Sequence, residues 1–389
     1  MAKTVRLGIV GVGGMGATHA RLVLEGRVEG LRLAALADRS DPAARVPELA
    51  GIPAFPPGDA MLKSGLIDAV LIATPHYAHT ADGIAALKAG LHVLVEKPIS
   101  VHKADALRLL AAHRGRGRQV FAAMFNQRTD PAFLRIRALM SAGELGELCR
   151  VQWTSTHWFR TDAYYTSSAW RATWAGEGGG ILLNQCPHQL DMLHWLFGLP
   201  QRVRASCGFG RYHAIEVEDD VTACLTWKGG ATGVFIASTG ESPGTNRLEI
   251  VGTRARVVFE NDRLAITRNQ VPMDAFARTA PGPFDRPPAN EETVHLPDRG
   301  GQHLAILQNF SDAIRTGTPL IAPAREGLAS VELANAMLLS AWTDREIELP
   351  LDADRYARAL SRRVRSSAGL RKPPGRRVSA ADLAKSFAP

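Results

Sequence analysis

Short apolar runs alternate with helix-like stretches over the first 125 residues. Between several of these runs, as at residues 77–89 and 101–113, apolar side chains recur every three or four positions, which is the spacing of one helix face. Fully apolar strands that alternate with helices predict a parallel sheet covered on both sides. The expected strands are residues 5–10, 31–37, 68–74, 92–95 and 119–125.

The pattern changes after about residue 148, where strand-like segments follow one another with few helices between them. Glycine pairs such as Gly229 and Gly230 are typical of the turns that join antiparallel strands. One helix, with Cys186, Leu190 and Leu193 on a single stripe, interrupts the strands. The expected later elements are strands at residues 149–157, 202–212, 221–226, 231–238, 247–251 and 255–260, and helices near 304–314 and 325–341.

These patterns predict two domains. We expect residues 1–125 to form an α/β Rossmann domain with a doubly wound parallel sheet. Residues 126–345 are expected to form an α+β domain with a large open, mainly antiparallel sheet, for substrate binding and oligomerisation; its Pro- and Gly-rich residues 269–302 are interpreted as a long surface loop. Because the late helices cover only part of an open sheet, a homodimer or homotetramer formed through it is expected. Residues 346–389 are interpreted as a basic C-terminal tail.

The positive charge of the chain is concentrated in that tail. The formal net charge is +8, and residues 355–389 hold ten Lys/Arg and one acidic residue, which gives +9 there and −1 for the rest. A basic tail is more often solvated or docked at an interface than used to read nucleic acid, so no nucleic-acid partner is expected.

Neither a membrane span nor a metal site is indicated. The sequence holds no apolar run of about eighteen residues, the length that a spanning helix needs. The N-terminus enters a strand-like run directly, without the pattern of a signal peptide. The four cysteines form no C-x-x-C pair, which favours reduced thiols in a cytoplasmic protein over a disulfide scaffold or a zinc site.

A glycine-rich turn follows the first strand. Gly11, Gly13 and Gly16 fit G-x-G-x-x-G between an apolar strand and a helix, the fingerprint of a dinucleotide site. The first glycine permits the tight turn, the second lets the backbone approach a pyrophosphate, and the third allows close packing of helix and strand. The anion would lie at the positive end of the helix. The residues expected to hold it are Gly11, Val12, Gly13, Gly14, Met15 and Gly16.

Two residues at the end of the second strand bear on the choice of dinucleotide. The Asp38 carboxylate can accept hydrogen bonds from the adenosine ribose hydroxyls and would repel a 2′-phosphate, which favours NAD. Arg39 follows it directly and could instead bind that phosphate, so NADP stays open.

Glu96-Lys97-Pro98 ends the fourth apolar strand. Ligands of doubly wound sheets bind at the carboxyl ends of the strands. Pro98 restricts Lys97 to an extended backbone, which fixes the direction of its side chain toward that edge.

Together with other motifs, this tripeptide resembles the glucose-fructose oxidoreductase / inositol dehydrogenase / rhizopine-catabolism family. The resemblance covers about residues 4–345 and implies an NAD(P)-dependent dehydrogenase or reductase that acts on a sugar, cyclitol or sugar derivative. It implies catalytic roles for Lys97 and His188, with Asn184 where many members carry aspartate. The motifs that carry it are Ile72-Ala73-Thr74-Pro75 with His79, Glu96-Lys97-Pro98, Met124-Phe125-Asn126-Gln127-Arg128, and Gly178-Gly179-Gly180 running through Asn184 to His188 and Asp191; Thr74, Pro75, His79, Glu96, Lys97 and Asn126 match its cofactor side.

The residue types fit this chemistry. Oxidation of a secondary alcohol moves a hydride to nicotinamide while a base takes the hydroxyl proton; a neutral imidazole such as His188 suits the base. The Lys97 ammonium can stabilise the developing alkoxide. His188 is expected to open a helix four residues after Asn184, so both side chains can lie on one face toward the cleft. An amide carries no charge, so Asn184 is interpreted as a hydrogen-bonding positioner, and Asp191 as a helix residue with local bonds.

Aromatic and arginine residues gather just before the second glycine-rich turn. Aromatic faces stack on sugar C–H groups, and arginine donates to hydroxyls or carboxylates. A structural lid or a subunit contact is the alternative for each of these residues. The expected substrate residues are Trp170, Arg171, Tyr164 and His157.

Two other functions stay open at this point. The family resemblance extends to a non-catalytic dinucleotide-binding regulator and to NAD-dependent glycosidases that use transient redox chemistry. Lys97 and His188 argue against the regulator, whereas Asn184 favours it slightly.

Overall fold

The computed structural model describes residues 4–296, 298–367 and 382. Their first part forms a six-stranded parallel sheet in the order β3-β2-β1-β4-β5-β6, which confirms the Rossmann prediction. The expected strands at 5–10, 31–37 and 92–95 match the observed bounds. The elements are β1 (Val5–Val10), α1 (Gly14–Leu24), β2 (Leu31–Ala37), α2 (Pro42–Arg45), η1 (Pro47–Leu49), β3 (Ala54–Phe55), β4 (Ala69–Ile72), α3 (His76–Lys88), β5 (His92–Val95), α4 (Lys103–His113) and β6 (Phe121–Ala123).

Strand order reverses between β1 and β4, so the carboxyl ends of these strands open onto one crevice. Strands β4 and β5 are almost completely buried, as their continuous apolar sequences predict. The loops that follow β1, β4 and β5 therefore meet at one edge of the sheet, and the glycine-rich turn and Lys97 lie in two of them.

The second sheet has nine strands in the order β14-β13-β12-β11-β7-β10-β9-β8-β15. Only the pair β7 and β10 is parallel, so the prediction of an open, mainly antiparallel sheet is confirmed. One face packs on helices such as α11, while residues such as Gln152 and Thr222 on the other face are exposed. The strands are β7 (Leu148–Ser155), β8 (Arg202–Phe209), β9 (Glu218–Thr226), β10 (Thr232–Ser238), β11 (Asn246–Gly252), β12 (Ala255–Glu260), β13 (Arg263–Asn269), β14 (Ala289–His295) and β15 (Ile347–Glu348).

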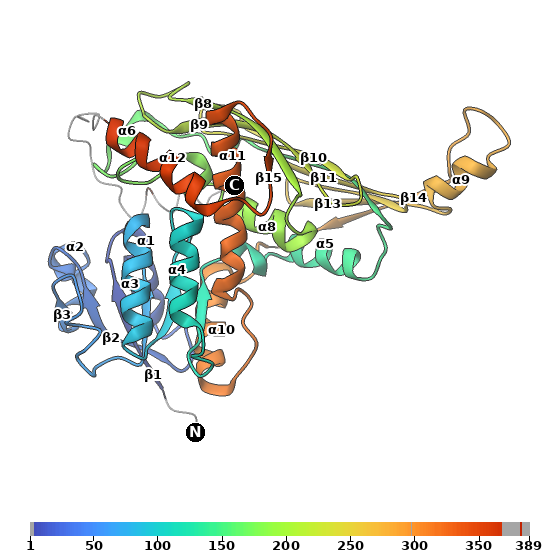
Figure 1. The fold of residues 1–389 in the computed structure, drawn as a ribbon. Helices are drawn as coiled ribbons and strands as arrows, with labels where there is room; N and C mark the ends of the chain where they lie inside the picture. Colours follow the sequence, from blue (N-terminus) through green and yellow to red (C-terminus); the bar gives the residue numbers. More distant parts are fainter. Residues whose placement is uncertain (1–3, 297, 368–381, 383–389) are drawn as a thin grey trace.

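The interpretation of residues 269–302 as a loop is wrong. The segment contains helix α9 (Met273–Thr279) and strand β14, which pairs with β13 as the edge of the sheet. Figure 1 shows this hairpin projecting from the far end of the sheet, and Phe284 in it is 91% exposed. The sequence Ala-Asn-Glu-Glu-Thr-Val-His lacks apolar alternation because both faces of this edge strand are exposed.

Helices connect and cover the two sheets. Side chains of α10 such as Ile306 and Phe310 belong to the Rossmann core, whereas α11 runs from Val331 in that core to Leu333 and Met337 in the other. The domain boundaries stay a prediction. The remaining helices are η2 (Asn126–Thr129), α5 (Pro131–Ser141), α6 (Asp162–Thr166), α7 (Ile181–Asn184), α8 (Pro187–Phe197), α10 (Gln302–Thr316), η3 (Ala324–Glu326), α11 (Gly327–Thr343) and α12 (Ala353–Ser366).

The described part of the basic tail is chiefly helix α12, whose Tyr356 and Leu360 are buried. Residues 368–381 and 383–389 of that tail lie outside the described residues. In the part of the chain that is described, no helix is long and apolar enough to cross a membrane.

Candidate functional site

The glycine-rich turn has the shape that a pyrophosphate requires. Gly11 has a φ of +86°, which favours glycine, and a Cβ there would lie 2.7 Å from the Ala73 carbonyl oxygen. A Cβ on Gly16 would lie 1.9 Å from the Gly11 carbonyl oxygen, so this glycine lets α1 start close to the turn. A Cβ on Gly13 would meet no atom within 4 Å. The turn therefore leaves open space beside Gly13, where the N-terminus of α1 favours an anion.

The Asp38 carboxylate lies against this turn. Its Oδ2 accepts a hydrogen bond from the Val12 N–H at 2.7 Å, and its Oδ1 accepts from both the N–H and the hydroxyl of Ser40 at 3.0 Å. Arg39 is exposed. These residues fit the adenosine side of NAD, because a carboxylate is fixed at the end of β2 beside an open glycine turn.

Lys97 projects from the end of β5 toward the second domain. Its Nζ donates a hydrogen bond to the Asn184 carbonyl oxygen at 2.6 Å, and its side chain is half-buried. Burial lowers the pKa of Lys97, while the charges of Glu96 and Glu177 oppose that change and Arg171 reinforces it.

His188 lies close enough to Lys97 to feel its charge. Burial first, and then Lys97 and His303, lower the pKa of His188 well below its usual value, so the imidazole is neutral at pH 7. Its Nδ1 is buried without a hydrogen-bond partner among the described residues. The Phe125 ring meets it edge to face at 6.3 Å.

Asn184 lies at the end of one helix, and His188 lies in the first turn of the next, as expected of a residue that opens a helix. Helix α7 ends at Asn184, and α8 begins at Pro187 after a short break. The Asn184 amide is held on both sides: its Nδ2 donates to Glu177 Oε1, and its Oδ1 accepts from the Tyr164 hydroxyl at 3.2 Å.

Three of the four expected substrate residues join this cluster. The Tyr164 hydroxyl accepts from Arg171 at 2.5 Å, and the Arg171 guanidinium lies 4.3 Å from the centre of the Tyr164 ring and 4.9 Å from that of Trp170. Trp170 in turn meets the His76 ring at 5.6 Å. His157 is exposed and packs on Trp158, and no hydrogen bond or ring contact found in the described residues joins it to Lys97, Asn184 or His188.

A buried histidine contacts a buried carboxyl group that is next to Lys97 in sequence. The His19 Nε2 is 2.7 Å from Glu96 Oε1. Burial opposes ionisation of Glu96, but the hydrogen bond and charge of His19 outweigh it and lower the pKa of Glu96 to about 2. His303 lies 5.6 Å from the His19 ring, and burial together with His19 lowers the pKa of His303 to about 4. His19 and His303 are not predicted from the sequence, because nothing in their local pattern sets them apart.

Other residues on the expected cofactor side are tied into the protein. The ring nitrogens of the buried His79 lie 2.8 Å from the Pro98 carbonyl oxygen and 2.7 Å from that of Thr74, so His79 braces two strand ends rather than presenting its ring to a ligand. Thr74 Oγ1 donates to Asp82 at 2.9 Å. Asn126 Nδ2 donates to Gln302 Oε1 at 2.6 Å.

Asp191 has a long-range partner, and the expectation of local bonds is wrong. Its two oxygens accept from the Nε and Nη2 of Arg128 at 2.8 and 2.6 Å, and both side chains are fully buried. Such a pair compensates two charges that would be costly to bury singly. It joins η2 to α8, the helix that carries His188.

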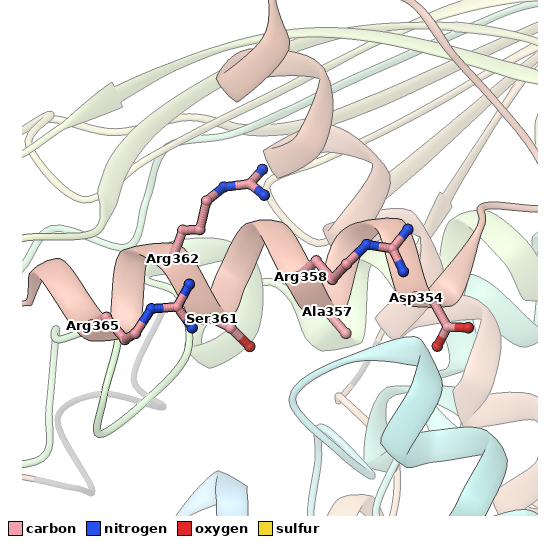
Figure 2. Close-up of a pocket in the computed structure, with 6 residues that line it drawn as sticks. All are labelled: Asp354, Ala357, Arg358, Ser361, Arg362 and Arg365. Carbon is pink, nitrogen blue, oxygen red and sulfur yellow. The ribbon is translucent and has the colours of Figure 1, made fainter.

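A separate hollow of about 410 Å³ lies on helix α12 (Figure 2). Figure 2 shows three arginines projecting from this helix. Its lining residues are Asp354, Ala357, Arg358, Ser361, Arg362 and Arg365, which include none of the candidate site residues.

The fold and the glycine turn define an NAD-binding oxidoreductase domain joined to a second, sheet-based domain. Two family profiles match the chain: "Oxidoreductase family, NAD-binding Rossmann fold" over residues 5–124 and "GFO/IDH/MocA C-terminal domain" over residues 133–258. The chain belongs to the GFO/IDH/MocA oxidoreductase family.

Curated relatives include several inositol dehydrogenases. Inositol 2-dehydrogenase 1 of Saccharopolyspora erythraea is 32% identical over 202 residues, which cover 50% of this chain and 54% of that protein. The match thus spans about half the length of this relative. Inositol 2-dehydrogenase of Rhizobium meliloti is 29% identical over 354 residues, which cover 89% of this chain and 99% of the relative.

Solved structures share this fold over 90% of the chain. The WlbA dehydrogenase of Chromobacterium violaceum, in complex with NADH and UDP-GlcNAcA, is 27% identical with a TM-score of 0.76, covering 90% of this chain and 97% of that one. A levoglucosan dehydrogenase in complex with NADH and L-sorbose is 20% identical with a TM-score of 0.75, covering 90% of this chain and 100% of that one, and shows the fold alone.

Proposed function

We propose that this chain is an NAD-dependent dehydrogenase that moves a hydride between a secondary alcohol of a cyclitol, sugar or sugar derivative and nicotinamide. One observation carries the proposal: the ammonium of Lys97 and the neutral imidazole of His188, 91 positions apart in sequence, lie within electrostatic reach of each other at the ligand-binding edge of the sheet. The relatives named inositol 2-dehydrogenase support the substrate class.

Bound NAD supplies the hydride acceptor. Lys97 Nζ donates a hydrogen bond to the alcohol oxygen and stabilises the negative charge that develops there. The neutral His188 ring accepts the hydroxyl proton, which an imidazolium could not do. Asn184, held between Glu177 and Tyr164, presents its remaining N–H and oxygen lone pair to the substrate.

The cofactor and substrate sites are proposed to meet at these two groups, so that the alcohol carbon can contact the nicotinamide ring. The glycine turn binds the pyrophosphate, and Asp38 accepts from the adenosine ribose, which selects NAD over NADP. Thr74, Pro75, Glu96 and Asn126 line the nicotinamide side. Trp170, Arg171 and Tyr164 form the wall that stacks on and hydrogen-bonds the substrate.

The exposed face of the nine-stranded sheet is proposed as the surface that joins copies of the chain into a dimer or tetramer. Its outward residues combine short apolar side chains with charges of both signs, such as Val258, Arg150 and Glu249. An open sheet of this size gains by covering that face.

A panel of cyclitols, aldoses and anhydrosugars with NAD and with NADP tests the function. Sustained growth of absorbance from reduced nicotinamide with at least one member supports the proposal. Bound NAD without turnover of any member would instead identify a dinucleotide-binding regulator. Cleavage of a glycoside without net reduction would identify a glycosidase that recycles its cofactor.

A further inference from the structure

Residue 184 is an asparagine, yet the structure places a carboxylate directly behind it. Glu177 is 1% exposed, and its Oε1 accepts from the Asn184 Nδ2. Its Oε2 accepts from the Ala172 N–H at 2.6 Å. Both oxygens are therefore hydrogen-bonded, which favours the ionised form of a buried carboxyl group.

The turn around Glu177 fixes where its carboxylate points. The Glu177 and Gly178 N–H groups both donate to the Thr173 carbonyl oxygen, at 2.9 and 3.2 Å. Gly178 has a φ of +80°, and a Cβ there would lie 2.2 Å from Val101 Cγ1. The backbone is thus held in a tight turn, and the Glu177 carboxylate bridges the Ala172 N–H and the Asn184 amide.

Asn184 connects this carboxylate to the ammonium of the site. Its backbone oxygen accepts from Lys97 Nζ at 2.6 Å, while its side chain donates to Glu177. The charge of Glu177 acts on Lys97 in the same direction as that of Glu96, favouring the ammonium against burial. Positions 177 and 184 together therefore supply one negative charge to Lys97, and the charge resides on Glu177.

We infer that Glu177 is a positioning residue that supplies, through the Asn184 amide, the active-site negative charge that Asn184 itself lacks. The inference rests on the proposed function for its role in turnover. Two carboxylates at hydrogen-bond distance cannot both ionise readily, so a carboxylate at 177 requires a neutral residue at 184. An amide there also has a defined orientation, because its nitrogen faces Glu177 and its oxygen faces Tyr164.

Variants that move the carboxylate from position 177 to position 184 test the proposed role of Glu177. Glu177→Gln keeps the shape but removes the charge, and Asn184→Asp places a second carboxylate against the first. Each single variant is expected to lower kcat by roughly 10- to 100-fold, with the KM for NAD unchanged. The double variant Glu177→Gln/Asn184→Asp restores one carboxylate and one amide, so its kcat should recover to within about 5-fold of the wild type, which is strong coupling for a contacting pair.

The pH profile distinguishes a charge effect from a structural one. Asn184→Asp should shift the acidic limb of kcat to higher pH, because one of two facing carboxyl groups keeps its proton longer. Glu216→Gln is the matched control, since Glu216 also accepts from a backbone N–H of this segment, that of Trp174 at 3.2 Å. That variant should keep the wild-type kcat and pH profile.

Thermal unfolding of the chain without cofactor or substrate gives a readout that does not depend on turnover. Asn184→Asp should lower Tm more at pH 8 than at pH 5, and adding Glu177→Gln should remove that difference. If the wild type oxidises no member of the panel, the proposed function fails while this arm still tests the pairing. The inference would be overturned if Tm of Asn184→Asp depended on pH in the same way as Tm of the wild type. It would also be overturned if kcat of the double variant were no higher than that of the less active single variant.

Discussion

Glu218 is a buried carboxyl group whose protonation is expected to set part of the pH dependence of the free energy of unfolding. It lies on β9, is 0% exposed, and its Oε1 accepts from the N–H groups of Gly180 at 2.8 Å and Leu182 at 3.1 Å. Its Oε2 has no hydrogen-bond partner among the described residues. Burial raises the pKa of Glu218 from 4.5 to about 7, although these backbone hydrogen bonds oppose the change.

The size and sign of the effect follow from that pKa. The folded chain binds the proton more tightly than the unfolded chain, so the contribution to stability is complete below about pH 4.5 and is lost as the pH rises through about 7. Because one pKa unit corresponds to about 1.4 kcal/mol, ionisation of Glu218 costs the folded chain about 3 kcal/mol. The carboxyl group that ionises is hydrogen-bonded to the start of α7, the helix that ends at Asn184.

Glu218→Gln mimics the protonated acid at every pH. Its free energy of unfolding relative to the wild type should therefore rise by about 3 kcal/mol between pH 4.5 and pH 8. Urea unfolding followed by tryptophan fluorescence measures this, since all 7 tryptophans come after residue 150 and report on the domain that holds Glu218. The exposed Glu291→Gln is the control and should parallel the wild type. Superimposable profiles for Glu218→Gln and the wild type over this range would refute the reasoning.

Three further predictions concern the cofactor and the reaction. Gly13→Ala should keep the wild-type Tm but weaken NAD binding by about 10-fold or more by calorimetry, because its Cβ enters open space that the pyrophosphate needs. Gly16→Ala should instead lower Tm, because its Cβ would meet the Gly11 carbonyl oxygen. Equal NAD affinity of Gly13→Ala and the wild type would contradict the assignment of the pyrophosphate site. Lys97→Ala should keep NAD affinity within about 3-fold but lower kcat by about 1,000-fold, and retained turnover would discredit the role of the ammonium. Asp38→Ala should reduce the preference for NAD over NADP, as judged by the ratio of kcat/KM values, and an unchanged ratio would remove Asp38 from cofactor selection.

The sequence predicts the Rossmann domain well because its strands are buried on both faces. Continuous apolar runs such as β4 and β5 leave little choice of secondary structure. Strand β14 could not be predicted, since an exposed edge strand has no apolar face to reveal its period. Helix α12 was likewise hidden, because its arginines suggested a solvated tail and masked the buried Tyr356 and Leu360.

The residues of the candidate site also differ in how far the sequence could predict them. Lys97 and the glycine turn can be predicted from local sequence motifs, because their geometry depends on adjacent residues. Partners brought together by tertiary packing carry no such signal, as the pairs Asp191–Arg128 and Glu96–His19 show. The sequence signal for Glu177 was weak, since it consisted only of an acidic residue directly before three glycines.

Helix α11 begins in one core and ends in the other, and α10 before it is built into the nucleotide-binding half. The polypeptide therefore passes between the two hydrophobic cores more than once. For the same reason, a fragment ending near residue 125 would lack the wall that α10 provides and would expose the apolar surface beneath Phe310.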